Sequence, residues 1–332
     1  MDVTDSNNRD AALDFVKGIL VIVMVIYHVM NYFSTAGSAG FGYVRFVTGS
    51  FIFVSGYIIS RFYEKKYRID RSGTSRRLFA RGVKLLIIFT ALNVFINLTA
   101  IGNPGKAPLG MRQYLGNLSA IYVSGNGRLA AFQILLPISY LLLLSPALLF
   151  LDGFKKSMIV TTLLVAFCFS WFHVDSDNLS LGLVGVLGLS AGMAINELQG
   201  SFSIKNRLII VSCLLVCIYL MGYLSRNVIA YSIGVGIVLK LFYDLAKTVN
   251  LRKQINQRII LFGQYTLICY IMQIALLQGL FRILSGKRWG LGYETVSVFI
   301  VTNIVLLGLC RLVKFLRDRY ESADKTYRFI FS

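Results

Sequence analysis

Residues 13–33 read LDFVKGILVIVMVIYHVMNYF, an apolar stretch long enough to cross a lipid bilayer as a helix. Two ionisable side chains, Lys17 and His28, interrupt it. Such groups are costly at membrane depth, so they usually face a protein interior or a wet cavity and mark a functional site. Because eleven positions are about three helical turns, both side chains project from nearly the same face, roughly 16 Å apart along the axis.

The residues around this pair extend the pattern. Asp14 lies three positions before Lys17 and joins the same face, where it can pair with the lysine. A second interpretation stays open, in which Lys17 reaches the headgroups and His28 only bonds between helices. Residues 1–12 carry no basic run and no small-residue cleavage pattern, so we expect the stretch to be kept as a span.

The composition of the whole chain agrees with a membrane protein. Of 332 residues, 56% are hydrophobic, 13% aromatic and 15% charged, which is typical of polytopic membrane proteins and too apolar for a soluble globule. We predict an all-α fold of about ten transmembrane helices forming one integral-membrane domain over residues 1–332. The expected spans are 13–33, 42–63, 78–100, 129–151, 157–173, 179–196, 207–224, 227–245, 259–284 and 291–316.

Basic residues are unevenly shared between the connecting segments. If the N-terminus is cytoplasmic, the cytoplasmic segments hold roughly three times as many Lys and Arg as the outer ones, and residues 61–84 are the densest block. We therefore expect both termini in the cytoplasm. The net charge of +19 then follows from topology and requires no nucleic-acid partner.

Metal and disulfide chemistry are disfavoured by the few residues that could support them. The five cysteines fall in apolar runs without a CxxC pattern, and the two histidines are His28 and His173. We expect no metal site and no structural disulfide. His173, beside Asp175 and Asp177, could belong to an acceptor-binding cluster or to a solvated loop.

Four stretches resemble, in order, the acyltransferase family 3 proteins of the transmembrane acyltransferase superfamily. They are RDAALDFVKGILVIVMVIYH (9–28), FIFVSGYIISRFYEKKY (51–67), SRRLFARGVKLLIIF (75–89) and FGQYTLICYIMQIALL (262–277). The basic residue and histidine of the first stretch are the most specific part. Ten spans with cytoplasmic ends also fit that family.

The resemblance implies a reaction and gives residues roles in it. Members move an acyl group from cytosolic acyl-CoA, here expected to be acetyl-CoA, to a hydroxyl of a carbohydrate at the membrane. His28 would be the general base that takes the acceptor's proton, a task suited to neutral imidazole with its unperturbed pKa near 6.5. A covalent acyl-histidine is the alternative. Lys17 would hold a CoA phosphate or order the carbonyl path, with Asp14 as its orienting partner.

The resemblance also suggests where the two substrates bind. Arg76, Arg77 and Arg81 would bind the CoA phosphates, although basic residues gather at cytoplasmic span ends in any membrane protein. Ser55 would line the acceptor site, or Ser55-Gly56 would only allow close helix packing. Gln273 stands where many relatives carry a histidine, so it can hydrogen-bond to a substrate but cannot shuttle a proton.

Other functions remain as alternatives at this point. A transporter or flippase could use Asp14, Lys17 and His28 as a relay, and an assembly or sensing component could keep the scaffold without turnover. Within the enzyme interpretation, the acceptor is a cell-surface polysaccharide or a lipid-linked carbohydrate, and N-acylation of an amino sugar is the alternative to O-acylation. We expect a multi-pass protein of the plasma (inner) membrane, and a homo-oligomer stays open.

Overall fold

The computed structural model describes residues 10–34, 42–98, 111–125, 130–150, 176–195, 206–224, 227–284, 287, 289 and 292–331. Within these residues the regular structure is helical, apart from one isolated bridge between Ser34 and Trp289. The all-α prediction is confirmed for this part of the chain. The chain divides into two compact units, which are described separately; the single domain expected over 1–332 stays a prediction.

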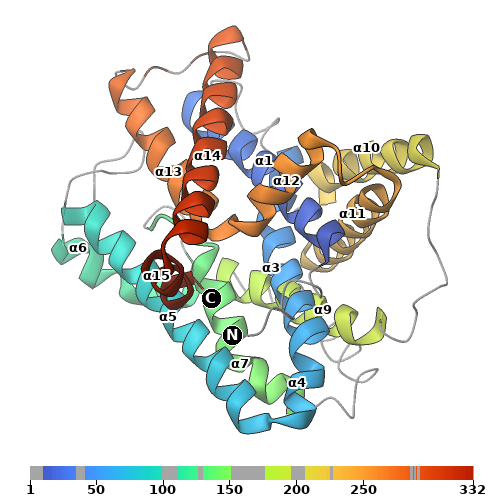
Figure 1. Cartoon of the computed structure of the whole chain (residues 1–332). Coiled ribbons are helices and arrows are strands. Elements are labelled where there is room, and N and C mark those ends of the chain that lie inside the picture. Colours follow the sequence, from blue (N-terminus) through green and yellow to red (C-terminus); the bar gives the residue numbers. More distant parts are fainter. Residues whose placement is uncertain are drawn as a thin grey trace. The chain divides into compact units, whose positions relative to one another are not determined.

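The first unit comprises Met1–Val47, Phe202–Gly222 and Ile237–Ser332. Its central helix is α1, which packs against α12, α13 and α14 (Figure 1). Apolar side chains are buried on several sides of α1, as expected for a helix surrounded by others. The helices of this unit are α1 (Ala11–Phe33), most of α10 (Arg207–Leu224), the later part of α11 (Val228–Thr248), α12 (Gln254–Gln264), α13 (Thr266–Ile283), α14 (Tyr293–Arg319) and α15 (Glu321–Phe331).

The stretch 259–284, expected as one span, is broken at Tyr265 between α12 and α13. The Thr266 hydroxyl donates to the Gly263 carbonyl at 2.7 Å and so satisfies an acceptor at the end of α12. A side chain at Gly263 would collide with the Asp14 carbonyl, so α12 lies directly against α1 at this point. The break lets α12 follow α1 while α13 runs in a direction of its own.

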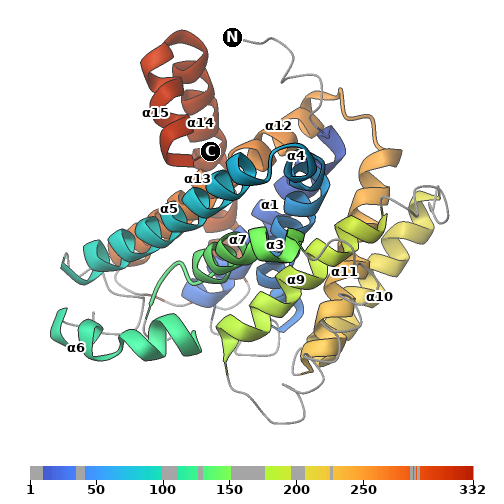
Figure 2. The same ribbon diagram turned by 90° about the horizontal axis from the view of Figure 1, so that it is seen from below.

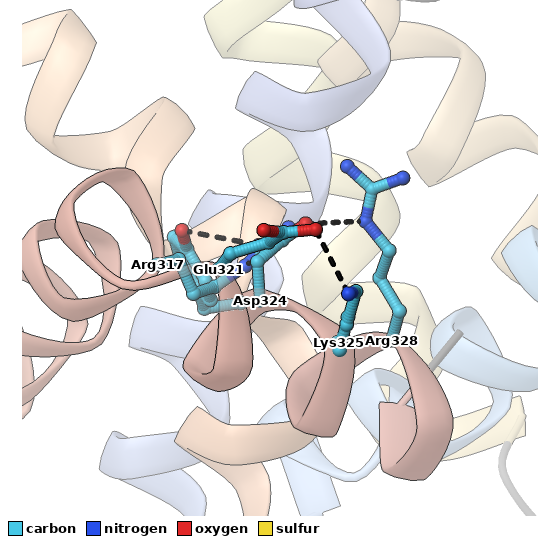
Figure 3. Close-up of polar contacts among 6 residues, drawn as sticks. Arg317, Glu321, Asp324, Lys325 and Arg328 are labelled. Atoms are coloured by element: carbon cyan, nitrogen blue, oxygen red, sulfur yellow. Dashed lines mark hydrogen bonds and ion pairs between the residues drawn. The ribbon is translucent and has the colours of Figure 1, made fainter. Parts of the chain in front are cut away.

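The last helix, α15, lies across the end of α14. It is seen end on in Figure 1, where α14 runs lengthwise, and along its length in Figure 2. Arg317 of α14 joins the two helices, because its Nη2 and Nε donate to Asp324 Oδ1 at 2.7 and 2.9 Å. Asp324 also accepts from Arg328 Nε at 2.7 Å, and Lys325 pairs with Glu321 along α15 (Figure 3).

The same arginine reaches the α12–α13 break. Its guanidinium lies 3.9 Å from the centre of the Tyr327 ring and 5.7 Å from that of Tyr265, and its Nη1 donates to the Tyr265 hydroxyl at 3.3 Å. The Arg317 guanidinium beside Asp324 holds the pKa of that carboxyl below its ordinary value. Arg317 therefore braces α14, α15 and the residue between α12 and α13.

The second unit comprises Thr48–Ser201 and Tyr223–Gly236. Its longest helix, α5, packs along α7, and α9 packs against α7 and η2 (Figure 2). Asp70 separates α4 from α5 and accepts a hydrogen bond from the Gly73 amide at 2.8 Å. The elements are α3 (Phe46–Ile58, mostly in this unit), η2 (Ile59–Tyr63), α4 (Glu64–Ile69), α5 (Arg71–Leu98), α6 (Met111–Gly116), η3 (Ala120–Ser124), α7 (Leu135–Phe150) and α9 (Asp177–Ile195).

Six of the described helices are long and apolar enough to cross a membrane: Ala11–Phe33, Gly42–Ile69, Arg71–Ile96, Ile229–Thr248, Thr266–Ile283 and Tyr293–Arg319. Leu135–Phe150, Asp177–Met193 and Arg207–Tyr223 are shorter apolar helices. The expected span 157–173 lies outside the described residues, as do His173 and Asp175. The count of ten and the cytoplasmic location of the termini stay predictions.

Candidate functional site

The first turns of α1 carry a buried ion pair. Lys17 Nζ lies 2.6 Å from Asp14 Oδ1, with 18% of the lysine side chain and 5% of the aspartate side chain exposed. The pair expected from the spacing of three residues is therefore present. Since a charge left alone in such a place is costly, removing either partner should destabilise the helix.

The start of α1 is fixed by a second aspartate. Asp10 caps the helix, because its Oδ1 accepts from the amides of Ala12 and Leu13 at 2.9 and 3.1 Å. Its Oδ2 accepts from the Tyr243 hydroxyl of α11 at 2.9 Å. The cap and the tyrosine thus hold the helix end from which Asp14 and Lys17 project.

Two glycines allow α1 and α12 to cross closely beside this ion pair. A Cβ placed on Gly18 would lie 1.9 Å from the Ile259 carbonyl oxygen, and one on Gly263 would lie 1.8 Å from that of Asp14. Neither position has room for a side chain. Sequence analysis did not single out these glycines, although small residues at helix crossings are a known packing device in membrane proteins.

Farther along α1, His28 is held among aromatic rings. Its ring centre lies 5.1 Å from that of Tyr27, 5.9 Å from Tyr32 and 6.4 Å from Tyr270 of α13. Both ring nitrogens are buried, and neither has a hydrogen-bond partner in the described part of the chain. Buried polar atoms are nearly always paired, so this imidazole is unusual in having both nitrogens available to hydrogen-bond a substrate.

The facing helix α13 contributes a second buried polar group. Gln273 is 1% exposed, and its Oε1 has no hydrogen-bond partner among the described residues. Tyr270 and Gln273 are one turn apart on the buried side of α13, which packs against α1. Four of the predicted site residues thus belong to the first unit. Asp14, Lys17 and His28 lie on α1, and Gln273 lies on the neighbouring helix α13.

The remaining predicted residues belong to the second unit. The Ser55 hydroxyl donates to the Phe51 carbonyl of its own helix at 2.8 Å. A Cβ on Gly56 would lie 2.0 Å from the Gly185 carbonyl oxygen of α9, so Gly56 permits a close helix contact. The packing interpretation of Ser55-Gly56 thus has a structural basis, while the binding role of Ser55 stays a prediction.

The three arginines lie on α5, which begins earlier than expected, at Arg71. Arg76 and Arg77 are exposed, whereas Arg81 is half-buried, donates to the Tyr63 hydroxyl and lies 5.6 Å from the centre of its ring. Arg77 and Arg81 are one turn apart on one side of the helix, and Arg76 lies about 140° around from Arg81. The helix therefore offers a pair of arginines on one side and a third pointing elsewhere.

A second ion pair with a buried carboxylate lies on α11. Lys240 Nζ contacts both carboxylate oxygens of the buried Asp244, at 2.7 and 2.6 Å. Among the residues that the structure describes, no group of three or more His, Cys, Asp and Glu could hold a metal ion. The buried thiols of Cys269 and Cys310 lie 3.1 Å apart and share a hydrogen bond, without a disulfide.

Comparison with known proteins places these features in a family. The acyltransferase family 3 domain, described as an acyltransferase domain, matches residues 10–311. This range includes every residue predicted for the site. The chain belongs to the acyltransferase 3 family.

No curated protein and no solved structure matches the chain. The family match and the apolar helices together define a multi-pass membrane acyltransferase. Sequence analysis did not single out the aromatic neighbours of His28. Tyr27 and Tyr32 flank it in the printed sequence, but nothing local to the sequence indicates that Tyr270 lies beside it.

Proposed function

We propose that this protein transfers an acetyl group from acetyl-CoA to a hydroxyl of a cell-surface or lipid-linked carbohydrate, at the plasma (inner) membrane. The observation that carries the proposal is His28, whose two ring nitrogens are buried and have no partner among the described residues, on the same helix as the Asp14–Lys17 pair. The family match favours acyl transfer over transport, flipping or a purely structural role.

In the proposed reaction, His28 acts as a general base. It takes the proton of the acceptor hydroxyl while the acceptor oxygen attacks the thioester carbonyl carbon. The tetrahedral intermediate collapses with cleavage of the carbon–sulfur bond, and the imidazolium returns its proton to the CoA sulfur. The products are an acetyl ester and free CoA. The aromatic rings around His28 keep water from competing with the acceptor.

Lys17 and Asp14 would position the donor at one end of α1. Asp14 is buried and bonded to Lys17, so it orients the ammonium group toward a CoA phosphate or toward the path of the carbonyl. Gln273 would accept or donate a hydrogen bond to the acceptor through a side chain that is otherwise unpaired at Oε1. Ser55 is proposed as a further acceptor contact.

Arg76, Arg77 and Arg81 would bind the phosphates of CoA from the cytoplasm. The exposed side chains of Arg76 and Arg77 are accessible to a soluble ligand, and Arg81 is oriented by Tyr63. N-acylation of an amino sugar uses the same base and the same donor. It would differ only in the acceptor atom.

The experiment that tests the proposal is release of free CoA from acetyl-CoA by the purified protein, with a panel of carbohydrate acceptors. Acceptor-dependent release that disappears in His28→Gln but not in Asn31→Ala would support it. Asn31 is a suitable control because it is exposed on the same helix, less than one turn from His28. Full turnover in His28→Gln would overturn the role of the base.

The donor site has its own test. Arg77→Gln and Arg81→Gln should raise the KM for acetyl-CoA, while Lys65→Gln, an exposed charge in the same 61–84 block, should leave it unchanged. An equal effect of all three would mean that only the general positive field attracts the donor. No effect of any would place the CoA site elsewhere.

Sidedness can be tested with single cysteines in a cysteine-free background. A membrane-impermeant reagent should label Asp177→Cys in intact cells and Ser72→Cys only after the cytoplasmic face is opened. Both positions are exposed on described helices. Labelling of Ser72→Cys in intact cells would put the arginines on the wrong side for cytosolic acyl-CoA.

A further inference from the structure

The second unit contains a pocket that the proposed reaction does not use. Its volume is about 580 Å³, within the range of ligand-binding cavities. It lies between the later half of α5 and the segment containing α6 and η3, which packs beside α5 in Figure 1. The apolar side chains that line it are Val94, Met111, Leu115 and Leu118.

Four residues with hydroxyl groups also line the pocket, Thr90, Tyr114, Ser119 and Tyr122, and all but Ser119 form a directional chain. The Thr90 hydroxyl donates to the Leu86 carbonyl at 2.8 Å, so its oxygen must accept from the Tyr122 hydroxyl at 2.7 Å. The Tyr122 proton is then in use, and its oxygen accepts from the Tyr114 hydroxyl at 3.3 Å. All three protons are therefore committed within the protein.

This arrangement selects against polar ligands. Burial raises the pKa of Tyr114 above its ordinary value, so its phenol stays protonated and bonded to Tyr122. No Lys, Arg, Asp or Glu lines the pocket. The exposed Ser119 carries the one lining hydroxyl outside the chain, so a sugar or a phosphate placed here would lose its hydration for a single donor, whereas a hydrocarbon loses nothing on entering.

The wall of the pocket is held by other helices rather than by a ligand. The Tyr122 carbonyl accepts from the Tyr140 hydroxyl of α7 at 2.8 Å and from Asn178 Nδ2 of α9 at 3.0 Å. The Val123 carbonyl accepts from the Ser176 hydroxyl at 3.1 Å. These bonds fix η3 in place, so the pocket is a built feature of the unit.

We propose that this pocket binds the hydrocarbon chain of a lipid. The partner is defined by chemistry: a flexible apolar chain that fills a cavity lined mainly by apolar side chains and by hydroxyls already bonded to one another. Two sources can supply such a chain, a membrane phospholipid and the lipid portion of a lipid-linked acceptor. The proposal does not depend on the identity of the acyl donor or on the role of His28.

The test uses the full-length protein in detergent with two photoactivatable probes, a phospholipid with a diazirine in its acyl chain and a diazirine-bearing polyprenyl phosphate. After illumination, labelling of residues 111–122 is measured by mass spectrometry. Leu118→Trp fills the pocket and should reduce that labelling about tenfold, equivalent to about 1.4 kcal/mol of binding. The matched control Val123→Trp adds the same bulk to an exposed neighbour outside the lining.

Labelling by both probes would identify a membrane lipid as the occupant, and labelling by the polyprenyl probe alone would identify the chain of a lipid-linked acceptor. Labelling that Leu118→Trp leaves unchanged, or that Val123→Trp reduces equally, would overturn the proposal. If Leu118→Trp fails to fold, competition by unlabelled lipid in the unaltered protein tests the proposal instead. Excess unlabelled lipid must then abolish labelling of 111–122 but not of the exposed apolar face of α10, and non-saturable labelling of both would refute the site.

Discussion

The surroundings of His28 and the pocket lined by Tyr122 bury polar groups in opposite ways. His28 and Gln273 keep buried atoms without hydrogen-bond partners among the described residues. Thr90, Tyr122 and Tyr114 instead commit every hydroxyl proton to one another or to a backbone carbonyl. Unpaired buried groups are costly, so their presence agrees with the proposed chemistry, whereas a saturated hydroxyl chain leaves a wall that favours a hydrocarbon.

The largest expected effect comes from removing the imidazole. His28→Ala should lower acyl transfer by about 10²–10⁴-fold, the usual contribution of a general base. Expression and thermal stability in detergent should stay near those of the unaltered protein, because no hydrogen bond is lost. Initial rates of CoA release measure the effect. Activity that survives in His28→Gln but not in His28→Ala would assign His28 a structural role. His28 would then no longer differ in purpose from the hydroxyls of the pocket.

Breaking the ion pair at the start of α1 should be the next largest change. Lys17→Met leaves Asp14 buried without its partner and should destabilise the first unit by about 3–5 kcal/mol. Lys17→Arg keeps the charge and should be the mildest substitution there. Detergent melting temperatures report the difference. If the double variant Asp14→Asn, Lys17→Met is no more stable than Lys17→Met, the cost does not arise from the unpaired carboxylate.

A cut in the hydroxyl chain should affect stability but not catalysis. Tyr122→Phe leaves the Tyr114 hydroxyl buried without its acceptor, which should cost about 1–3 kcal/mol. The melting temperature should fall while acyl transfer per folded molecule stays unchanged. As a comparison, Tyr43→Phe alters a tyrosine of the first unit outside the site, where the ring stacks on Tyr219. A loss of turnover in Tyr122→Phe would show that the hydroxyl chain contributes to acyl transfer.

The smallest expected effect concerns the ion pairs of Asp324 with Arg317 and Arg328, where α14 meets α15. Asp324 is paired with Arg317 and Arg328 near the surface, so Asp324→Asn should cost at most about 1 kcal/mol. Because the folded-state pKa of Asp324 is lowered, its contribution is present above the unfolded pKa near 3.9 and is lost as the pH falls through the folded value. The stability gap between variant and unaltered protein should therefore close in acid.

The melting temperatures of both proteins, measured between neutral pH and acid, check this sign. The exposed pair of Lys325 and Glu321 offers a control, since Glu321→Gln removes an ion pair of α15 without touching Arg317. A gap that widens toward acid would show that the carboxylate is not stabilised in its charged form by the arginines.

Much of the fold followed from residues close together in the sequence. Hydropathy predicted α1, α10, α11 and α14 within a few residues, and the spacing of three predicted the Asp14–Lys17 contact. The start of α5 was placed seven residues late, because 71–77 is polar and its helix depends on the Asp70 cap. The break at Tyr265 was missed because 259–284 is mostly apolar and long enough for one span, and because the interruption serves the contact with α1.

By itself, the sequence determined that this is an all-α membrane acyltransferase, since span length, hydropathy and the family motif are properties of short stretches of chain. Only the tertiary structure decided that Gly18 and Gly263 mark a helix crossing, that Tyr270 lies beside His28, and that Thr90, Tyr122 and Tyr114 saturate one another. These facts join residues up to about 250 positions apart, and pairing over such distances depends on how helices pack. A pattern within a short stretch of sequence does not predict which distant residues that packing brings together.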